Sequence, residues 1–312
     1  MNLTNTSSPH IRGNFRTGRI MLDVVLALLP AWVVGIIMFG VRALLVGLVC
    51  MVTAVATEWI YHLISRNKNT VKDFSAVVTG LLLALTLPHS VPYWVAAIGS
   101  VFAILFVKLL FGGLGQNIFN PALTARAFLM LLFPAAITRY EGVDAVTSAT
   151  PLHHMVKPEL PAESILDMFL GRCPGSIGEI SALALLVGGA YLVYRKVISL
   201  RIPLAYIGTV AVITFVFPNA GSPIEWMLYS VCSGGLILGA VFMAMDYTSS
   251  PITPVGQIIY GIGCGVLTVI FRYFGLFPEG VTYAILLMNA LVWIIDEHTA
   301  PRRFGTGKGG AA

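Results

Sequence analysis

"IMLDVVLALLPAWVVGIIMFG", residues 20–40, is an apolar run of membrane-spanning length that contains a single charged residue, Asp23. A helix needs roughly 20 predominantly apolar residues to cross the hydrocarbon core of a bilayer. The whole chain has the same character, because 57% of its 312 residues are hydrophobic and only 11% are charged. Soluble domains carry about 25% charged residues. With a mean hydropathy of +0.86, the chain is predicted to be an α-helical protein that crosses a membrane many times.

Ten apolar runs are candidate spans, so the predicted fold class is an all-α polytopic membrane protein with about ten transmembrane helices. Two of the runs, 74–88 and 121–133, are short and bounded by proline, which is typical of broken or tilted helices that line a site at membrane depth. The candidate spans are residues 20–40, 43–64, 74–88, 93–111, 121–133, 177–194, 202–217, 224–244, 255–274 and 281–295.

The basic residues predict the orientation of these spans. If the N-terminus is cytoplasmic and ten segments cross in turn, 13 Lys and Arg residues fall inside and 5 fall outside. The positive-inside rule expects this asymmetry, so the net charge of +5 indicates topology and gives little support for a nucleic-acid partner. The predicted parts are a cytoplasmic N-terminal segment (1–19), a first bundle half (20–133), an extracytoplasmic loop (134–176), a second bundle half (177–299) and a cytoplasmic tail (300–312).

Two pairs of short motifs recur along the chain. "LTLPHSVPYW" returns loosely as "FVFPNAGSPIEW", and "FNPALT" has a counterpart in "SSPITP". Pro88 and Pro218 are 130 residues apart, and so are Pro121 and Pro251. Two coincident offsets predict duplicated halves that meet at a shared site, as in many transport folds. The sequence leaves open whether the two halves are parallel or inverted.

A polar patch, "DAVTSATPLHH" at residues 144–154, interrupts the apolar chain within the predicted extracytoplasmic loop. Catalysis by this patch is not expected, because no matching acid and nucleophile accompany the histidines. Adjacent His153 and His154 point in different directions on a regular backbone, so no metal site is predicted there. The four cysteines are scattered without a Cys-x-x-Cys pair, which leaves open only a metal cluster shared with another subunit.

Part of the patch resembles an attachment signal for a flavin. "DAVTSAT" matches, at Asp144, Thr147, Ala149 and Thr150, the signal by which a flavin transferase esterifies the phosphate of FMN onto a threonine hydroxyl. The common form of the signal has glycines at the positions of Ala145 and Ser148. An ordinary Ser/Thr turn before a proline is the alternative interpretation of these residues.

The variant "TSATPL" is similar to one family in particular, the D subunit of the Rnf complex, which is the ion-translocating ferredoxin:NAD oxidoreductase. Residues 112–134, "GGLGQNIFNPALTARAFLMLLFP", resemble this family and also the homologous B subunit of the sodium-pumping NADH:quinone oxidoreductase. "MAMDYTSSPITPVGQIIYGIGCG" (243–265) and "FPEGVTYAILLMNALVWIIDEHTAPRRFG" (277–305) are closer to the Rnf side. The resemblance runs from about residue 12 to the end of the chain.

The resemblance implies a membrane electron-transfer subunit with two flavins. Thr150 would carry FMN through a phosphoester, with Asp144, Thr147 and Ser148 recognised by the flavin transferase. A second, noncovalent flavin, riboflavin, would lie near Asn117 and Asn120, whose amides offer both a donor and an acceptor to an isoalloxazine edge. The alternative for these two residues is helix capping ahead of Pro121.

The resemblance also implies partners and a location. The partners would be other Rnf subunits, among them membrane subunits and a second flavin-bearing extracytoplasmic subunit, together with the lipid bilayer of a prokaryotic cell membrane. The chain would be a subunit of a translocase that couples electron flow between ferredoxin and NAD to Na+ or H+ movement, and would not be catalytic alone. A Gly-rich nucleotide loop between a strand and a helix is missing from the sequence, so other subunits are expected to bind NAD and ferredoxin.

Acidic residues in spans are expensive and usually functional or paired, which makes Asp23 and Asp246 candidates for an ion or redox path. Asp246 could instead cap a helix, and Glu58 could lie near the membrane interface. Alternative functions also stay open: a solute channel or transporter with duplicated helices, a scaffold subunit, or the quinone-reductase homologue.

The predicted topology can be tested at position 157. A Lys157→Cys variant should react with a membrane-impermeant thiol reagent as soon as the outer face of the membrane is accessible. Labelling only after that membrane is lysed would overturn the orientation.

Overall fold

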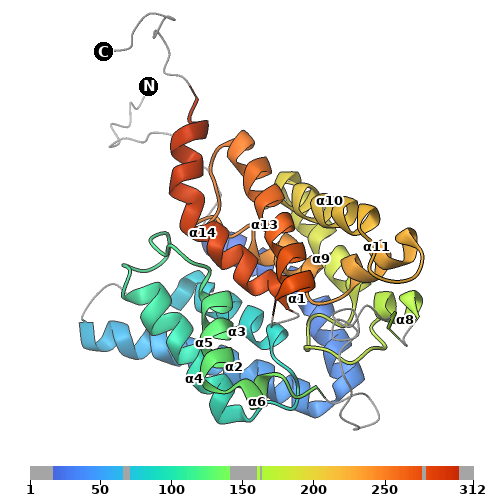
Figure 1. The fold of residues 1–312 in the computed structure, drawn as a ribbon. Coiled ribbons are helices and arrows are strands. Elements are labelled where there is room, and N and C mark those ends of the chain that lie inside the picture. The colour runs from blue at the N-terminus through green and yellow to red at the C-terminus, as the bar shows by residue number, and fades with distance from the viewer. Residues whose placement is uncertain (1–16, 66–70, 141–159, 162–163, 276–278, 302–312) are drawn as a thin grey trace, which may run out of the picture.

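The computed structural model describes residues 17–65, 71–140, 160–161, 164–275 and 279–301, and all regular structure within these ranges is helical (Figure 1). The predicted flavin-attachment residues Asp144, Thr147, Ser148 and Thr150 lie outside the described residues. The elements are α1 (Thr17–Phe39), α2 (Val41–Ser65), η1 (Val71–Asp73), α3 (Ser75–Thr86), α4 (Tyr93–Phe102), η2 (Ala103–Leu109), α5 (Pro121–Leu132), α6 (Pro134–Ile137), α8 (Ile165–Leu170), α9 (Ala182–Tyr194), α10 (Arg201–Val216), α11 (Pro223–Cys232), α12 (Leu236–Leu238), η3 (Gly239–Met243), α13 (Pro254–Phe274) and α14 (Gly280–Thr299).

Each predicted span coincides with one helix or with two or three consecutive helical elements, and the all-helical class is confirmed for the described residues. Four helices, α1, α2, α13 and α14, are long and apolar enough to cross a membrane. Pro223–Cys232 and Leu236–Met243 form a fifth candidate, bent by 60° at its break. The other apolar helices have 10–17 residues, so the count of about ten spans stays a prediction.

Large apolar side chains cover much of the outer surface of the bundle. Ile37 is 74% exposed, Leu63 66% and Trp293 67%. Faces of this kind are stable against lipid or another apolar subunit, where exposure to water is avoided. The interior, by contrast, is rich in small residues such as Ala27 and Ala43, which let helices approach one another closely. The helices therefore behave as those of a multi-pass membrane protein.

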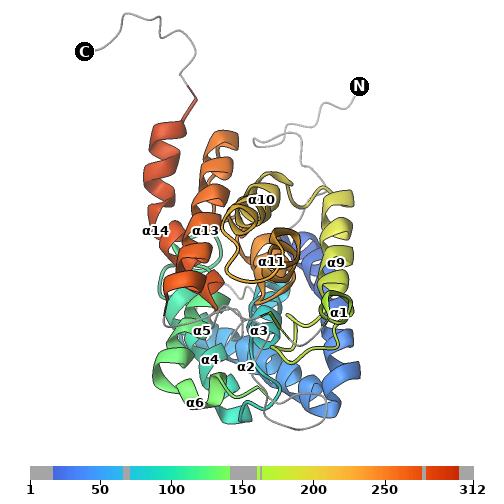
Figure 2. The same cartoon turned by 45° about the vertical axis from the view of Figure 1, so that its right-hand side comes forward.

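The two halves of the sequence interlock. Helix α1, from the first half, packs along α9, from the second, while α13 and α14 lie side by side at the opposite flank (Figure 2). An added Cβ at Gly188 of α9 would overlap the carbonyl oxygen of Ala27 in α1. The absence of a side chain at Gly188 thus sets how closely these two helices can approach.

The two halves share a sequence of structural elements around the recurring motifs. In both halves a helix ends in a π-helical turn, η2 or η3, and a polar connection follows before a proline-initiated helix. Helix α5 begins at Pro121, whereas α13 begins at Pro254, close to the predicted start of the span at residue 255 and three residues beyond Pro251, which matches Pro121 in the motif. The reason is local, because Thr253 caps α13 and proline is best tolerated in the first helical turn. The equivalent helix starts are therefore 254 − 121 = 133 residues apart.

The close contact between α1 and α9 leads to a stability prediction. Gly188→Ala should destabilise the protein in detergent by about 1–3 kcal/mol, because overpacking forces the two backbones apart. Gly208→Ala in α10 is the matched control, since an added Cβ there meets nothing within 4 Å. Alanine is the better helix former, so the control should be neutral or more stable. Thermal unfolding of the purified protein would compare the two, and equal midpoints would contradict the packing argument.

Candidate functional site

Two polar connections meet in the centre of the molecule. Asn117 lies between η2 and α5, and Asp246 lies between η3 and α13. The Asn117 side-chain amide donates to the carbonyl oxygen of Phe119 at 3.1 Å and to Asp246 Oδ2 at 3.4 Å. The structure thus joins a residue predicted to contact a flavin with one predicted for an ion or redox path, across 129 positions of sequence.

Asn120 performs the capping role that was the alternative for this residue. Its Oδ1 accepts hydrogen bonds from the backbone N–H groups of Ala122 at 3.0 Å and Leu123 at 3.2 Å, at the start of α5. Its Nδ2 donates to the carbonyl oxygen of Met243 at 3.2 Å, at the end of η3. Asn120 therefore fastens the two polar connections together, and its contact with a flavin stays a prediction.

Asp246 is held by hydroxyl groups from its own connection. Its Oδ2 accepts from Thr248 Oγ1 at 3.2 Å and from Ser249 Oγ at 3.3 Å, in addition to Asn117. The following helix α13 is capped by Thr253, so Asp246 does not serve as its N-cap. The carboxylate is thus fixed by neutral donors, and no described Lys or Arg forms an ion pair with it.

Around these groups lies a cavity that we call the central pocket. Its polar lining residues come from α3, η2 and the two connections, and its apolar residues come mainly from α1, α3, α9 and η3. Mostly apolar walls with a few convergent polar groups are typical of ligand and cofactor sites. The pocket is lined by Met21, Val24, Ser75, Val78, Thr79, Leu82, Lys108, Leu114, Asn117, Asn120, Pro121, Ala122, Leu192, Val197, Ile198, Val241, Phe242, Met245, Asp246 and Tyr247.

One wall of the central pocket carries a buried ion pair that no pattern in the sequence indicates. Lys108 Nζ donates to both carboxylate oxygens of Glu58 at 3.0 Å and to Ser75 Oγ at 2.7 Å. The Lys108 and Glu58 side chains are 3% and 0% exposed. Both residues lie within predicted spans, 93–111 and 43–64, and a charge within a span needs a partner. The structure shows that each is the partner of the other.

Asp23 joins α1 to α9. It accepts from the Tyr191 hydroxyl at 3.0 Å and from Arg195 Nη2 at 3.2 Å. The Arg195 side chain is 43% exposed, which places this pair at the edge of the bundle. These contacts tether α1 to the end of α9. The role of Asp23 in an ion or redox path stays a prediction.

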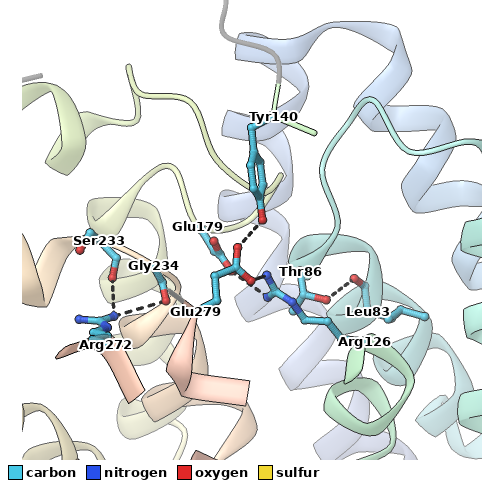
Figure 3. A network of polar contacts seen from close by, with 9 residues as sticks. All are labelled: Leu83, Thr86, Arg126, Tyr140, Glu179, Ser233, Gly234, Arg272 and Glu279. Atoms are coloured by element: carbon cyan, nitrogen blue, oxygen red, sulfur yellow. Dashed lines mark hydrogen bonds and ion pairs between the residues drawn. The ribbon is translucent and has the colours of Figure 1, made fainter. Parts of the chain in front are cut away.

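A second buried network surrounds Arg126 of α5 (Figure 3). Its guanidinium donates to Glu179 Oε1 at 2.9 Å and forms an ion pair with Glu279, to which the Tyr140 hydroxyl also donates. Glu179 precedes α9 and Glu279 precedes α14. Arg126 thus connects three segments from both halves. Sequence inspection could recognise Arg126 as a charge within a span, but it offered no indication of which carboxylates would reach it.

Figure 3 also shows Arg272 of α13, a second arginine inside the bundle. Its guanidinium donates to the carbonyl oxygens of Ser230, Ser233 at 2.9 Å and Gly234 at 3.5 Å. These carbonyls are released where α11 ends and α12 begins, at a break made by Gly234 and Gly235 with positive φ. A buried backbone group without a partner is costly, so Arg272 stabilises the break.

An all-helical chain with membrane-length apolar helices, broken spans and charges enclosed between helices is a polytopic membrane protein. The model of the NQR2, RnfD, RnfE family matches residues 4–305, and the chain belongs to this family.

Individual relatives cover nearly the whole chain. It is 49% identical to the D subunit of the Na(+)-translocating ferredoxin:NAD(+) oxidoreductase complex of Acetobacterium woodii, over 99% of this chain and 97% of the relative. It is 44% identical to the D subunit of the proton-translocating ferredoxin:NAD(+) oxidoreductase complex of Clostridium ljungdahlii, over 97% and 96%. It is 40% identical to the D subunit of the ion-translocating oxidoreductase complex of Stutzerimonas stutzeri, over 92% of both chains.

The Arg126 network gives a prediction about assembly of the fold. Arg126→Gln should destabilise the protein by about 3–5 kcal/mol, because removing one partner leaves buried carboxylates without a counter-charge. Arg201→Gln, at an exposed arginine 3.5 Å from Gln257, is the control and should have little effect. Adding Glu279→Gln to Arg126→Gln should recover part of the loss, since the charges act as one network. Thermal unfolding in detergent compares the wild type, the control, Arg126→Gln, Glu279→Gln and the double variant, and strictly additive effects of the two single substitutions would refute the coupling.

Proposed function

We propose that this chain is the membrane-embedded electron-transfer subunit of an ion-translocating ferredoxin:NAD oxidoreductase complex, with FMN esterified to Thr150 and riboflavin bound in the central pocket. The observation that carries the proposal is the "DAVTSAT" signal, in a chain whose relatives are named as D subunits of such complexes. Bound flavins would supply the one-electron and two-electron transfer that the side chains lining the central pocket cannot perform.

Thr150 has a simple chemical role in this proposal. Its hydroxyl becomes the ester oxygen that holds the FMN phosphate, and a flavin transferase supplies the catalysis, so no base is needed beside the threonine. Asp144, Thr147 and Ser148 serve recognition by that transferase. On the predicted topology this loop is extracytoplasmic, which favours electron exchange with a second flavin-bearing subunit on the same side.

The central pocket suits a noncovalent isoalloxazine ring. Its apolar walls, including Val24, Leu82 and Phe242, fit the face of a flat hydrophobic ring system. Among the described residues, the carbonyl oxygen of the Asn117 side chain accepts no hydrogen bond, which leaves an acceptor for a ring N–H. Asn120, which also lines the pocket, holds the start of α5 against the end of η3. A polar edge can thus be bound while the ring is kept from water.

Ten crossings remain our proposal for the topology. Helices α3 and α5 have 12 residues each, which corresponds to about 18 Å of helix, against a hydrocarbon core of about 30 Å. Each short helix would cross only together with its flanking connection. Such connections are tolerated at membrane depth when protein surrounds them, as it does around Asn120 and Asp246.

The partners of the complex follow from the same proposal. Other membrane subunits would cover part of the exposed apolar surface, and subunits outside this chain would bind NAD and ferredoxin. Of the three relatives named above, one belongs to a complex named as Na(+)-translocating and one to a complex named as proton-translocating, so the coupling ion is a property to be measured on the assembled complex. Asp23 and Asp246 are the residues of this chain that we propose for an ion or redox path.

The covalent flavin has a direct test. The wild-type chain, expressed with a flavin transferase, should give a band on a denaturing gel that fluoresces yellow-green under ultraviolet light. Thr150→Val should abolish this fluorescence, because valine is nearly isosteric but has no hydroxyl to esterify. Ferredoxin-dependent NAD reduction by the assembled complex should also stop.

Two controls make the test specific. Thr147→Val and Ser148→Ala should retain at least part of the fluorescence, since these residues are recognition positions in the proposal. Fluorescence that persists in Thr150→Val, with the flavin mapped by mass spectrometry to Thr147 or Ser148, would move the attachment site. A wild-type band without any flavin would refute the redox function and favour a channel or scaffold.

A further inference from the structure

In the Glu58–Lys108 ion pair, only the positively charged partner lines the central pocket. Lys108 and Ser75 line the pocket, whereas Glu58 does not. Glu58 belongs to α2, Ser75 to the first turn of α3, and Lys108 to the π-helical turn η2. The pair therefore presents its positive end to the pocket and keeps its negative end behind the wall. In a low-dielectric interior such an oriented pair produces a strong local field.

The hydrogen bond from Lys108 leaves the hydroxyl hydrogen of Ser75 available for donation and polarises it. An ammonium group has three hydrogens, and those of Lys108 are used by the two oxygens of Glu58 and by Ser75 Oγ. Ser75 Oγ is therefore an acceptor toward Lys108, and its own hydrogen has no acceptor among the described residues. The residue is 5% exposed and faces the pocket. A hydroxyl polarised by a neighbouring cation donates an unusually strong hydrogen bond.

Other lining residues of the same pocket have the opposite character. Asp246 brings a carboxylate, and Asn117 brings the carbonyl oxygen that lacks a donor among the described residues. A ligand that contacts both sets of groups would place a carbonyl oxygen toward Ser75 and an N–H group toward Asn117. The pocket therefore selects a ring with acceptor and donor groups on its polar edge, and it also selects the orientation of that ring.

We propose that Ser75, polarised by Lys108, donates a hydrogen bond to a carbonyl oxygen of the flavin in the central pocket and raises the reduction potential of that flavin. This inference rests on the proposed flavin site. Reduction increases the negative charge on the carbonyl-bearing edge of an isoalloxazine ring, so a donor backed by a cation binds the reduced ring more tightly than the oxidised ring. Lys108 is a positioning residue that acts through Ser75, and Glu58 keeps its ammonium group charged and in place.

A purely structural role for the triad makes a different prediction. If Glu58, Lys108 and Ser75 only hold α2, α3 and η2 together, their replacement would change stability and leave the potential of the retained flavin unaltered. The reduction potential of the bound flavin is therefore the informative quantity, and it is measured on the intact complex. Acid extraction of a separate sample shows which flavin is noncovalent, because FMN esterified to the chain stays with the protein.

The experiment uses the assembled complex purified with variant chains. Ser75→Ala removes the donor, and Glu58→Gln combined with Lys108→Met removes both charges of the ion pair together. Thr57→Val is the matched control, because it deletes a hydroxyl one residue from Glu58 that donates to Thr53 at 2.7 Å and does not line the pocket. Ser75→Thr retains a hydroxyl and tests for rescue.

Extraction and chromatography of one portion of each complex quantify its riboflavin. Spectroelectrochemical titration of the intact complex then gives the midpoint potential of the bound riboflavin. Ser75→Ala should weaken binding of the reduced ring relative to the oxidised ring by about tenfold, a shift of about 59 mV to more negative potential for one electron. The double variant should shift in the same direction, Thr57→Val should match wild type, and Ser75→Thr should lie between wild type and Ser75→Ala. Selective loss of riboflavin from Ser75→Ala would also support the contact.

Two results would refute the inference, and they are distinguishable. Riboflavin retained in Ser75→Ala and in the double variant at the wild-type potential would show that the triad is structural while the flavin site stands. A wild-type complex that contains no extractable flavin would refute the proposed site itself, and the tuning role with it.

Discussion

Inside the bilayer core, a backbone carbonyl or a charged side chain has no water to bind, so each must find its partner within the protein. This constraint determines where the polar residues of the chain lie. At the break between α11 and α12, the carbonyls of Ser233 and Gly234 are satisfied by Arg272. At the start of α5, the free N–H groups are satisfied by Asn120. Each interruption of a helix thus requires a polar side chain at the same depth.

The interruptions also create the site. Both halves place a π-helical turn ahead of a polar connection, and the connections carry Asn117 in one half and Asp246 in the other. Irregular backbone of this type is frequent at functional sites, because it directs polar groups inward where a regular helix would bond them to itself. Since the two connections contact each other, the pocket between them has walls from both halves. The same breaks that must be stabilised therefore supply the groups that can bind a cofactor.

The enclosed charges divide into two kinds. Asp23 with Arg195, and Arg126 with Glu179 and Glu279, connect segments that are distant in sequence and act as tethers between the halves. Lys108 with Glu58 differs, because its cationic end lies on the wall of the central pocket. The pairs around Arg126 and Lys108 are buried and therefore expensive, and each is stable only because its partners are already positioned by packed helices. The position of Lys108 on the pocket wall is the reason why we propose a redox role for that pair and a structural one for the others.

Hydropathy alone determined the helical class and the positions of the long helices α1, α2, α13 and α14, because their length and composition suffice for a membrane span. The sequence motifs and the charges within spans identified Asn117 and Asp246 as candidate site residues, and both line the central pocket. Only the tertiary structure decided which of these residues meet. Glu58 and Lys108 are 50 positions apart, Arg126 and Glu279 are 153 apart, and neither pair has a spacing signal. The physical reason is that local pattern reports how one segment faces its surroundings, whereas the partner of a buried charge depends on how separate helices pack.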